Sequence, residues 1–318
     1  MRSERFFNRR VTILSGGVGG AKLVVGAAQC VPPSRMTVIV NTADDSAFHG
    51  LHVSPDLDTT MYTLSGISNR KTGWGIDGDT FSALSFLRRY GEETWFHLGD
   101  RDLATHIVRT RLLQEGESLT RVTDLLARKL GVKVQILPMT DAKVETLIRW
   151  RGRWISFQEY FVRRGAKGKV TGIRFKGIPD AAPTRQVIEA LGKADLIIIA
   201  PSNPVVSILP ILSLPGIKEI LRRAKAFRVA ISPFIGNRAV SGPAKELIEA
   251  MGYGGSPLGL AKFYSGLIDL LVIDEKDAGK RGEIEAMGLG VMATPIVMRT
   301  VRDKIRLAQK ILHAGTRR

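Results

Sequence analysis

The sequence contains a single cysteine, Cys30, among 318 residues. A disulfide framework and a thiolate metal cluster both need several cysteines, so both are excluded. No run of about 18 apolar residues occurs, and we therefore expect no membrane-spanning helix. The basic N-terminus, MRSERFFNRR, lacks the long apolar segment of a secretory signal. We expect a protein of the reducing cytoplasm with no membrane partner.

Acidic residues are scarce relative to basic ones, 30 against 47, which gives a net charge of +17 at pH 7. Such a balance can indicate a nucleic-acid-binding protein. The basic residues are scattered, however, with one concentration between Arg149 and Lys169. No helix-turn-helix, zinc-finger or RNA-recognition signature accompanies them. We interpret the charge as a solvated basic surface or as attraction for small anionic substrates, and we expect no nucleic-acid partner.

Short β-branched runs alternate with helical stretches, which is the pattern of a parallel α/β sheet. Five runs are expected as buried strands: Val11–Ser15, Thr37–Asn41, Ala194–Pro204, Phe227–Asn237 and Leu270–Asp277. The later runs end in Ser, Asn or Asp residues. Because ligands bind beyond the carboxyl ends of strands in open parallel sheets, these polar residues predict one continuous site.

The spacing of apolar residues between positions 80 and 130 is helical, and positions 133–176 read as short strands with a basic, aromatic loop. The predicted fold is therefore α/β, a Rossmann-like, doubly wound, mainly parallel sheet with a mostly helical insertion. We expect the nucleotide-binding core to comprise residues 1–79 and 177–318, and the insertion to comprise residues 80–176.

A glycine-rich turn follows the first predicted strand. VTILSGGVGGAKL places Gly16, Gly17, Gly19 and Gly20 before a helix, with Lys22 close behind. Glycines permit close backbone approach to a phosphate, and a helix N-terminus supplies aligned N–H donors. The turn matches neither the dinucleotide fingerprint nor the Walker A loop. The alternative is a turn that only lets the helix pack on the sheet; we favour phosphate binding.

Four carboxylates lie close together in this basic chain: Asp44, Asp45, Asp56 and Asp58. The last two fall in the first turn of a predicted helix that starts at Ser54 and Pro55, where they would favour the positive end of the helix dipole. Helix capping leaves the adjacent pair unexplained. Carboxylates brought together need a cation or a retained proton. Because Mg²⁺ uses one or two carboxylates plus substrate phosphates, we favour a magnesium and diphosphate site.

Other polar residues leave alternatives open. His49 and His52 flank the carboxylates, but a zinc site lacks a clear third ligand. A helix capped by Asp100 would carry three polar residues on one face, as a surface ion-pair ladder or as a ligand-facing helix end: Asp102, His106 and Arg109. Trp74 lies between glycines and is either a platform for a flat ring or an ordinary packed tryptophan.

Several segments together resemble one family, in the same order from Val11 to about Asp277: GGVGGAKL, NTADD, SPDLDTTMYTLSG, GWGIDGDTF, LGDRDLATHIVRT, ILPMTD, FQEYFVRRG, APSNPVVSILPIL and SPFIGNRAVSGPA. They resemble the 2-phospho-L-lactate transferases of coenzyme F-420 biosynthesis. The resemblance implies a Rossmann-like homodimer that requires Mg²⁺. It implies transfer of a phospholactyl-type group from a guanosine-diphosphate-linked donor to the terminal hydroxyl of the deazaflavin Fo (7,8-didemethyl-8-hydroxy-5-deazariboflavin), with release of GMP.

The resemblance also implies roles for individual residues. The catalytic carboxylates would be Asp45 and Asp58, and the metal ligands would be Asp45, Asp56 and Asp58. The phosphates and the nucleotide would meet Gly16, Gly17, Gly19, Gly20, Lys22, Ser202, Asn203, Ser232, Gly236 and Asn237. The substrates would meet Asn41, Thr42, Trp74, Asp100 and Arg101, the last three on the Fo side.

Two questions stay open at this point. The start GGVGGAKL resembles bacterial members more than the GGTGTPKL type of methanogens, so the donor carries either a lactyl or an enolpyruvyl group. The same core also occurs in nucleotide-sugar-binding regulators linked to gluconeogenic growth. Those proteins share the glycine-rich turn but lack LGDRDLATH and ILPMTD, whose presence here favours the enzyme.

Overall fold

The computed structural model describes residues 8–315; the N-terminal residues 1–7, on which part of the signal-sequence expectation rests, lie outside this range. Its centre is a seven-stranded parallel sheet with the order β14-β13-β10-β9-β1-β2-β5. The strands are β1 (Val11–Ser15), β2 (Met36–Val40), β5 (Gln135–Pro138), β9 (Leu196–Ile199), β10 (Phe227–Ile231), β13 (Leu270–Ile273) and β14 (Gly290–Ala293).

The sheet confirms the predicted doubly wound fold. Strands β1 and β9 are buried along their whole length, as expected of parallel strands that are covered on both faces. The three later predicted strands end earlier than expected, so the polar residues that follow them lie in loops beyond the sheet. Two strands of this sheet, β5 and β14, were not foreseen as part of it, because QILP and GVMA are short and poor in β-branched residues.

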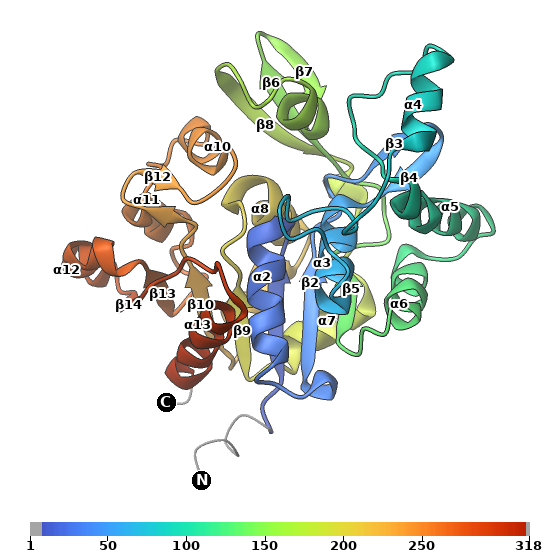
Figure 1. Cartoon of the computed structure of the whole chain (residues 1–318). Coiled ribbons are helices and arrows are strands. Elements are labelled where there is room, and N and C mark those ends of the chain that lie inside the picture. Colours follow the sequence, from blue (N-terminus) through green and yellow to red (C-terminus); the bar gives the residue numbers. More distant parts are fainter. Residues whose placement is uncertain (1–7, 316–318) are drawn as a thin grey trace.

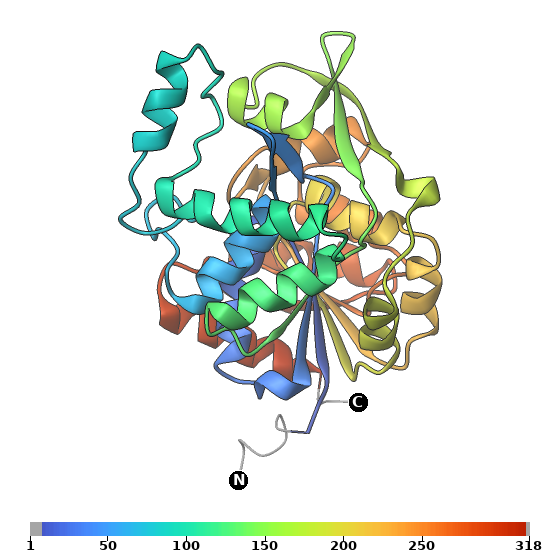
Figure 2. The ribbon, with the colours of Figure 1, turned by 90° about the vertical axis from the view of Figure 1, so that its right-hand side faces the viewer.

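Helices cover both faces of the sheet (Figures 1 and 2). Along β1, Ile13 belongs to one core and Leu14 to the other, because successive side chains of a strand point to opposite faces. The first core contains α2 (Gly17–Ala28), α3 (Pro55–Ser65), α6 (Leu119–Lys129) and α13 (Val301–Ala314). The second contains α7 (Arg185–Gly192), η4 (Pro204–Ile208), α8 (Leu209–Ser213), α9 (Ile217–Arg223), α10 (Ala244–Ala250), α11 (Pro257–Phe263) and α12 (Arg281–Glu285).

Two lobes project beyond the carboxyl ends of the strands (Figure 1). One carries α4 (Ser82–Arg89) and leads into α5 (Asp100–Gln114). The other is an antiparallel sheet of β6 (Glu145–Trp150), β7 (Arg153–Ser156) and β8 (Val170–Lys176). The π-helical turn η2 (Glu159–Arg163) connects β7 to β8. Strand β5 lies between them in sequence and pairs with β2, so the expected insertion at 80–176 contains one strand of the core.

The remaining elements are short: β3 (Ser46–Phe48) with β4 (Leu51–Val53), β11 (Phe234–Ile235) with β12 (Arg238–Ala239), η1 (Pro33–Arg35), η3 (Ile178–Asp180) and η5 (Glu275–Lys280). Within residues 8–315, no single helix is both long and apolar enough to cross a membrane. One strongly bent pair, 204–213 and 217–223, meets that test only when its two helices are taken together, by length and composition alone.

Two predicted helix starts need correction. Helix α3 begins at Pro55 as expected, but the Ser54 hydroxyl donates to Asp45 Oδ2 at 2.7 Å and does not cap the helix. Helix α5 is preceded by Gly99, and Asp100 is its first helical residue. The Asp100 carboxylate instead accepts the N–H groups that open α4, because the lobe folds back over the start of α5.

Candidate active site

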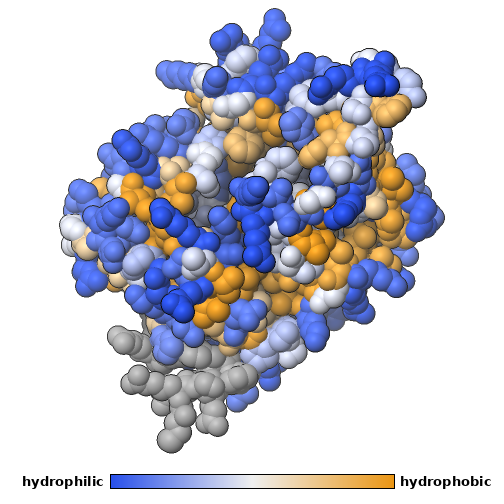
Figure 3. Space-filling view, viewed as in Figure 1, coloured by the Kyte–Doolittle hydropathy of each residue, from blue (hydrophilic) through white to orange (hydrophobic). Residues whose placement is uncertain are grey.

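A cavity of about 860 Å³ opens at the carboxyl ends of the central strands. Its wall includes the glycine turn after β1, Asp44 after β2, Ser202 and Asn203 after β9, and Ser232 after β10. The surface is hollowed in this region below the β6–β8 lobe (Figure 3). Strand order reverses between β1 and β9, where ligands bind in doubly wound folds. Polar residues that follow several strands therefore line one cavity.

The glycine turn packs tightly against its neighbours. A Cβ atom at Gly19 would lie 2.5 Å from the carbonyl oxygen of Pro201, which real side chains do not tolerate. Gly17 has a φ of +63°, in the left-handed region that favours glycine. Its N–H donates to Asp56 Oδ1 at 2.8 Å. The glycines therefore allow close packing of the turn. The same turn also places a helix N-terminus in the cavity wall, where it could meet a phosphate.

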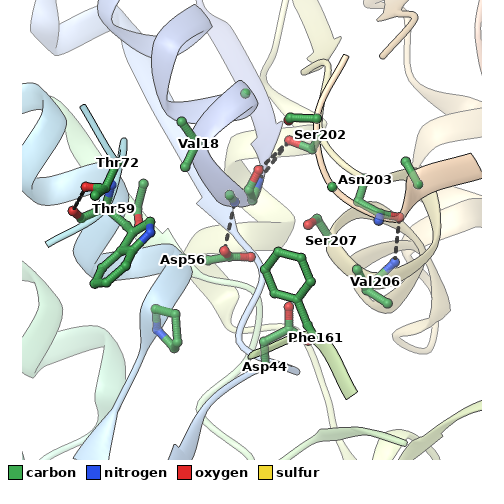
Figure 4. Close-up of a pocket in the computed structure, with 18 of the residues that line it drawn as sticks. Val18, Asp44, Asp56, Thr59, Thr72, Phe161, Ser202, Asn203, Val206 and Ser207 are labelled. Atoms are coloured by element: carbon green, nitrogen blue, oxygen red, sulfur yellow. Dashed lines mark hydrogen bonds between the residues drawn. The ribbon is translucent and has the colours of Figure 1, made fainter. Parts of the chain in front are cut away.

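Asp44 and Asp56 point into the same space beside this helix start (Figure 4). Asp56 Oδ2 also accepts a hydrogen bond from Asn41 Nδ2 at 3.0 Å. Burial raises the pKa of Asp56 to about 6. Burial and the nearby Asp56 charge raise the pKa of Asp44 well above its usual range. Asp44 Oδ1 is buried and has no hydrogen-bond partner in the described structure. The pair therefore offers a proton-sharing or cation-binding position.

Asp45 faces a different neighbourhood from Asp44. Its Oδ2 accepts from Ser54 and lies 3.1 Å from His52 Nε2, and the residue does not line the cavity. Burial, opposed by His52, raises its pKa. His49 lies 3.7 Å from a different carboxylate, Glu92. In the described range no three His, Cys, Asp or Glu side chains are arranged to hold a metal, so nothing supports the zinc alternative.

Asp58 belongs to a buried polar network in the cavity wall. Arg109 is fully buried and donates from Nη1 to Asp58 Oδ2 at 3.1 Å and from Nη2 to Oδ1. Its Nη1 also lies 3.3 Å from His106 Nδ1. Because a guanidinium only donates, Nδ1 accepts and the ring carries its proton on Nε2, 3.2 Å from Asp102 Oδ1. Tyr62 donates to the same Asp102 oxygen at 2.7 Å.

This network decides between the two interpretations of the polar face of α5. A surface ion-pair ladder would be exposed, whereas Asp102, His106 and Arg109 are buried. Asp102 and His106 also line the cavity, as does Asp58. The polar face of α5 is therefore buried against the cavity and is not a surface ladder.

The predicted nucleotide-side residues divide into two groups. Ser202, Asn203 and Ser232 line the cavity. Ser202 Oγ also donates to the carbonyl of Gly16 at 2.7 Å, which ties the β9 loop to the glycine turn. Five residues that were predicted to meet the phosphates, the nucleotide or a substrate do not line the cavity. Gly20 packs against the Ser15 and Ser202 side chains, and Gly236 and Asn237 lie in the β11–β12 turn. Asn41 and Thr42 are buried, and Asn41 donates to Asp56.

On the predicted acceptor side, Trp74 lines the cavity and is 43% exposed, so it is not an ordinary packed tryptophan. Asp100 and Arg101 do not line it. Sequence reasoning missed several lining residues: Trp95, Phe96, Phe157 and Phe161 as aromatic walls, and Arg299. The motif FQEYFVRRG contained two of these aromatics, but nothing in their spacing pointed to a cavity.

An ion pair joins the two lobes across the cavity. Arg163 of η2 contacts Glu93 through both nitrogens, at 3.2 and 2.5 Å. Its guanidinium lies 5.8 Å from the ring centroid of Trp95, whose Nε1 donates to Glu93 at 3.1 Å. Phe161 stacks on Phe157 at 5.4 Å. Aromatic side chains from both lobes thus form the outer part of the cavity wall.

The comparison with known proteins agrees with this geometry. Residues 11–290 match the family described as 2-phospho-L-lactate transferase CofD. The chain belongs to the 2-phospho-L-lactate transferase family. The family resemblance inferred from the motifs is therefore confirmed, and the protein is a transferase.

Relatives within this family carry two kinds of name. A 2-phospho-L-lactate transferase of Methanosarcina mazei is 39% identical over 302 residues, covering 95% of this chain and 99% of the relative. A phosphoenolpyruvate transferase of Streptomyces griseus is 42% identical over 309 residues, covering 95% and 97%. Another 2-phospho-L-lactate transferase, of Methanopyrus kandleri, is 41% identical over 309 residues, covering 96% and 97%.

A solved structure of another protein has the same fold as this chain. A crystal structure of a Bacillus halodurans protein, described as a member of the upf0052 family, superposes with a TM-score of 0.64 at 19% identity. It covers 96% of this chain and 98% of that one. At this level of identity the similarity shows a shared fold and carries no argument about activity.

Proposed function

We propose that the protein transfers a 2-phospholactyl or phosphoenolpyruvyl group from a guanosine-diphosphate-linked donor to the terminal hydroxyl of Fo, with release of GMP. The observation that carries the proposal is the Asp44–Asp56 pair beside the N-terminus of α2, in a chain of this family. A carboxylate pair next to aligned N–H donors suits a metal-bound diphosphate. A homodimer in the cytoplasm is part of the same proposal.

Mg²⁺ fits the residues at this point of the cavity. Asp44 has a buried oxygen without a partner, and burial raises the pKa of both carboxylates, so a divalent cation would offset their mutual repulsion. Asp44 and Asp56 would hold the ion. Of the other two expected ligands, Asp58 has both oxygens engaged by Arg109, and Asp45 points to His52. When bound, Mg²⁺ would neutralise charge on the donor diphosphate.

The remaining cavity accommodates the rest of both substrates. The first N–H groups of a helix have no intrahelical partner. The N–H of Gly17 is taken by Asp56, so the N–H groups that follow it in the first turn of α2 would meet the phosphates. Ser202, Asn203 and Ser232 supply polar atoms for the nucleoside. Trp74 and the aromatic walls of the two lobes suit the flat deazaflavin ring.

The chemistry needs little beyond positioning. The Fo hydroxyl attacks the phosphorus that bears the lactyl or enolpyruvyl oxygen, GMP leaves with the bridging oxygen, and a carboxylate of the Asp44–Asp56 pair would accept the hydroxyl proton. Holding the two reactants in line supplies much of the rate enhancement in phosphoryl transfer. The Arg109 network fixes α5 to α3 in the cavity wall, through its contacts with Asp58 and His106.

The test is mass spectrometry of Fo after incubation with enzyme, Mg²⁺ and each donor separately, with the Asp44→Asn variant as control. A phospholactyl adduct with GMP would identify the lactyl donor, and an enolpyruvyl phosphate adduct would identify the other. The absence of any adduct from folded, magnesium-loaded protein would refute the proposal.

The shared fold leaves one alternative to compare. A nucleotide-sugar-binding regulator would use the same core without a reaction. Preferential binding of a UDP-sugar over GDP would favour that alternative, whereas preference for GDP agrees with the transferase. The family match and the relatives' names favour the transferase.

A further inference from the structure

Two cationic side chains that are far apart in the sequence line the cavity. Among the lining residues that the structure describes, Lys22 of α2 and Arg299 between β14 and α13 are the lysine and arginine side chains. Neither forms an ion pair with a carboxylate in residues 8–315. Unpaired cations in a concave site are available to an anionic ligand.

The backbone holds Arg299 firmly. Its N–H donates to Asp303 Oδ2 at 3.2 Å, and Thr300 and Asp303 form a capping box that starts α13. The Asp303 carboxylate is occupied by these N–H groups, by the Thr300 hydroxyl and by Arg306 at 3.2 Å. It is therefore not the partner of the Arg299 guanidinium, which is exposed and forms no ion pair in residues 8–315.

The helix that follows Arg299 packs on the helix that carries Lys22. Helix α13 packs directly on α2, such that a Cβ atom at Gly26 would lie 3.1 Å from the Cβ of Lys304. Burial and the charges of Lys22 and Arg70 lower the pKa of Lys304. Helix α13 therefore brings the segment that carries Arg299 close to the helix that carries Lys22.

The cavity wall carries charges of both signs. Its carboxylates among the described residues are Asp44, Asp56, Asp58 and Asp102, and its lysine and arginine are Lys22 and Arg299. In the proposed transfer, a bond forms between the acceptor oxygen and phosphorus. The bond from that phosphorus to the bridging oxygen breaks, its electron pair goes to the nucleoside monophosphate, and the acceptor proton goes to a carboxylate. The leaving phosphate gains negative charge.

We propose that Lys22 and Arg299 bind the phosphate of the departing nucleoside monophosphate and stabilise the charge that it gains. This role rests on the proposed transfer and assigns a leaving-group function to Arg299 in particular. A cation at a position where negative charge develops in the transition state lowers the barrier.

Equilibrium binding of GMP and of guanosine, which lacks the phosphate, tests the site without any turnover. We expect wild-type protein to bind GMP more tightly than guanosine. Arg299→Gln should weaken the binding of GMP by about tenfold or more, because a charge-assisted contact is lost, and should leave the affinity for guanosine unchanged. Lys22→Met should behave alike. Arg302→Gln, an exposed arginine nearby that does not line the cavity, should change neither affinity.

Three results would overturn the inference: equal affinity of wild-type protein for GMP and guanosine, equal weakening of both by Arg299→Gln, or unchanged GMP affinity in that variant. Turnover separates this inference from the proposed function. If wild-type protein transfers the group but Arg299→Gln keeps its GMP affinity and kcat, the inference fails and the function stands. If no transfer occurs but the GMP effect does, the phosphate site stands and the transfer fails.

Discussion

Arg109 and Asp58 form a fully buried ion pair that fastens helix α5 to helix α3 at the cavity wall. Both oxygens of the carboxylate are engaged by the guanidinium. Asp58 thus looks in the sequence like a free helix-start carboxylate, but its charge is already compensated. The pair holds the ligand-facing side of α5 in place.

Breaking this pair should destabilise the protein strongly. We expect Arg109→Met to lower the free energy of unfolding by roughly 3–5 kcal/mol, because Asp58 is left buried and unpaired. Urea denaturation measures this loss. The double variant Arg109→Met with Asp58→Leu should recover much of it. A single variant as stable as the wild type would show that the pair does not hold α5.

The two adjacent aspartates should respond differently to amidation. Asp44→Asn should reduce kcat by about 100-fold or more and weaken the response to Mg²⁺, because Asp44 faces the cavity beside Asp56. Asp45→Asn should retain far more activity, because its contacts are Ser54 and His52. Magnesium titrations of the turnover rate in both variants check this. The reverse order of effects would return the catalytic role to Asp45.

The carboxylate pair should make stability depend on pH. The pKa of Asp56 rises from 3.8 to about 6 on folding, so the folded state holds this proton more strongly. Below pH 3.8 the protonated Asp56 makes its full contribution to the free energy of unfolding. This contribution is lost as the pH rises to about 6. The loss amounts to roughly 3 kcal/mol.

Unfolding measured between pH 4 and 7 without metal compares wild-type protein with Asp56→Asn. The variant should lose less stability as the pH rises, while its lost contact with Asn41 shifts all values together. Parallel curves would contradict the prediction. Added Mg²⁺ should stabilise wild-type protein more at pH 7 than at pH 5, because ionised carboxylates bind the ion.

The glycine turn should not accept even one methyl group at its tightest point. Gly19→Ala would bring Cβ against the Pro201 carbonyl, and we expect a loss of about 1–3 kcal/mol together with weaker nucleotide binding. Gly192→Ala is the matched control, since nothing lies within 4 Å of its Cβ position at the end of α7. Melting temperatures of the two variants compare them. Equal melting temperatures would contradict the close packing.

The sequence allows much of the fold to be predicted, for a physical reason. Strands buried on both faces, such as β1 and β9, must be continuous apolar runs, and these are visible without a structure. Strand β5 is only four residues long and ends in proline, and β14 begins with glycine, so neither carries that signal. Their places in the sheet depend on the partners that pair with them.

The sequence allows the part of the fold that forms the cavity to be predicted, but not every side chain that lines it. Residues at strand ends must meet in this fold, so the glycine turn, Ser202 and Asp56 were placed correctly in the cavity wall. Which of two adjacent aspartates faces inward depends on the path of a loop, and no periodicity encodes it. Arg299 is a single arginine in a basic chain, and only the docking of α13 on α2 brings it to the cavity.

The cavity wall runs from Gly16 near one end of the chain to Arg299 near the other. In a nascent chain, the glycine turn would leave the ribosome long before β14 and the segment that carries Arg299. Parallel pairing of distant strands also forms slowly. Substrates would thus find no complete pocket on a partly synthesised chain, and the competence to react would arise only when the last strand docks.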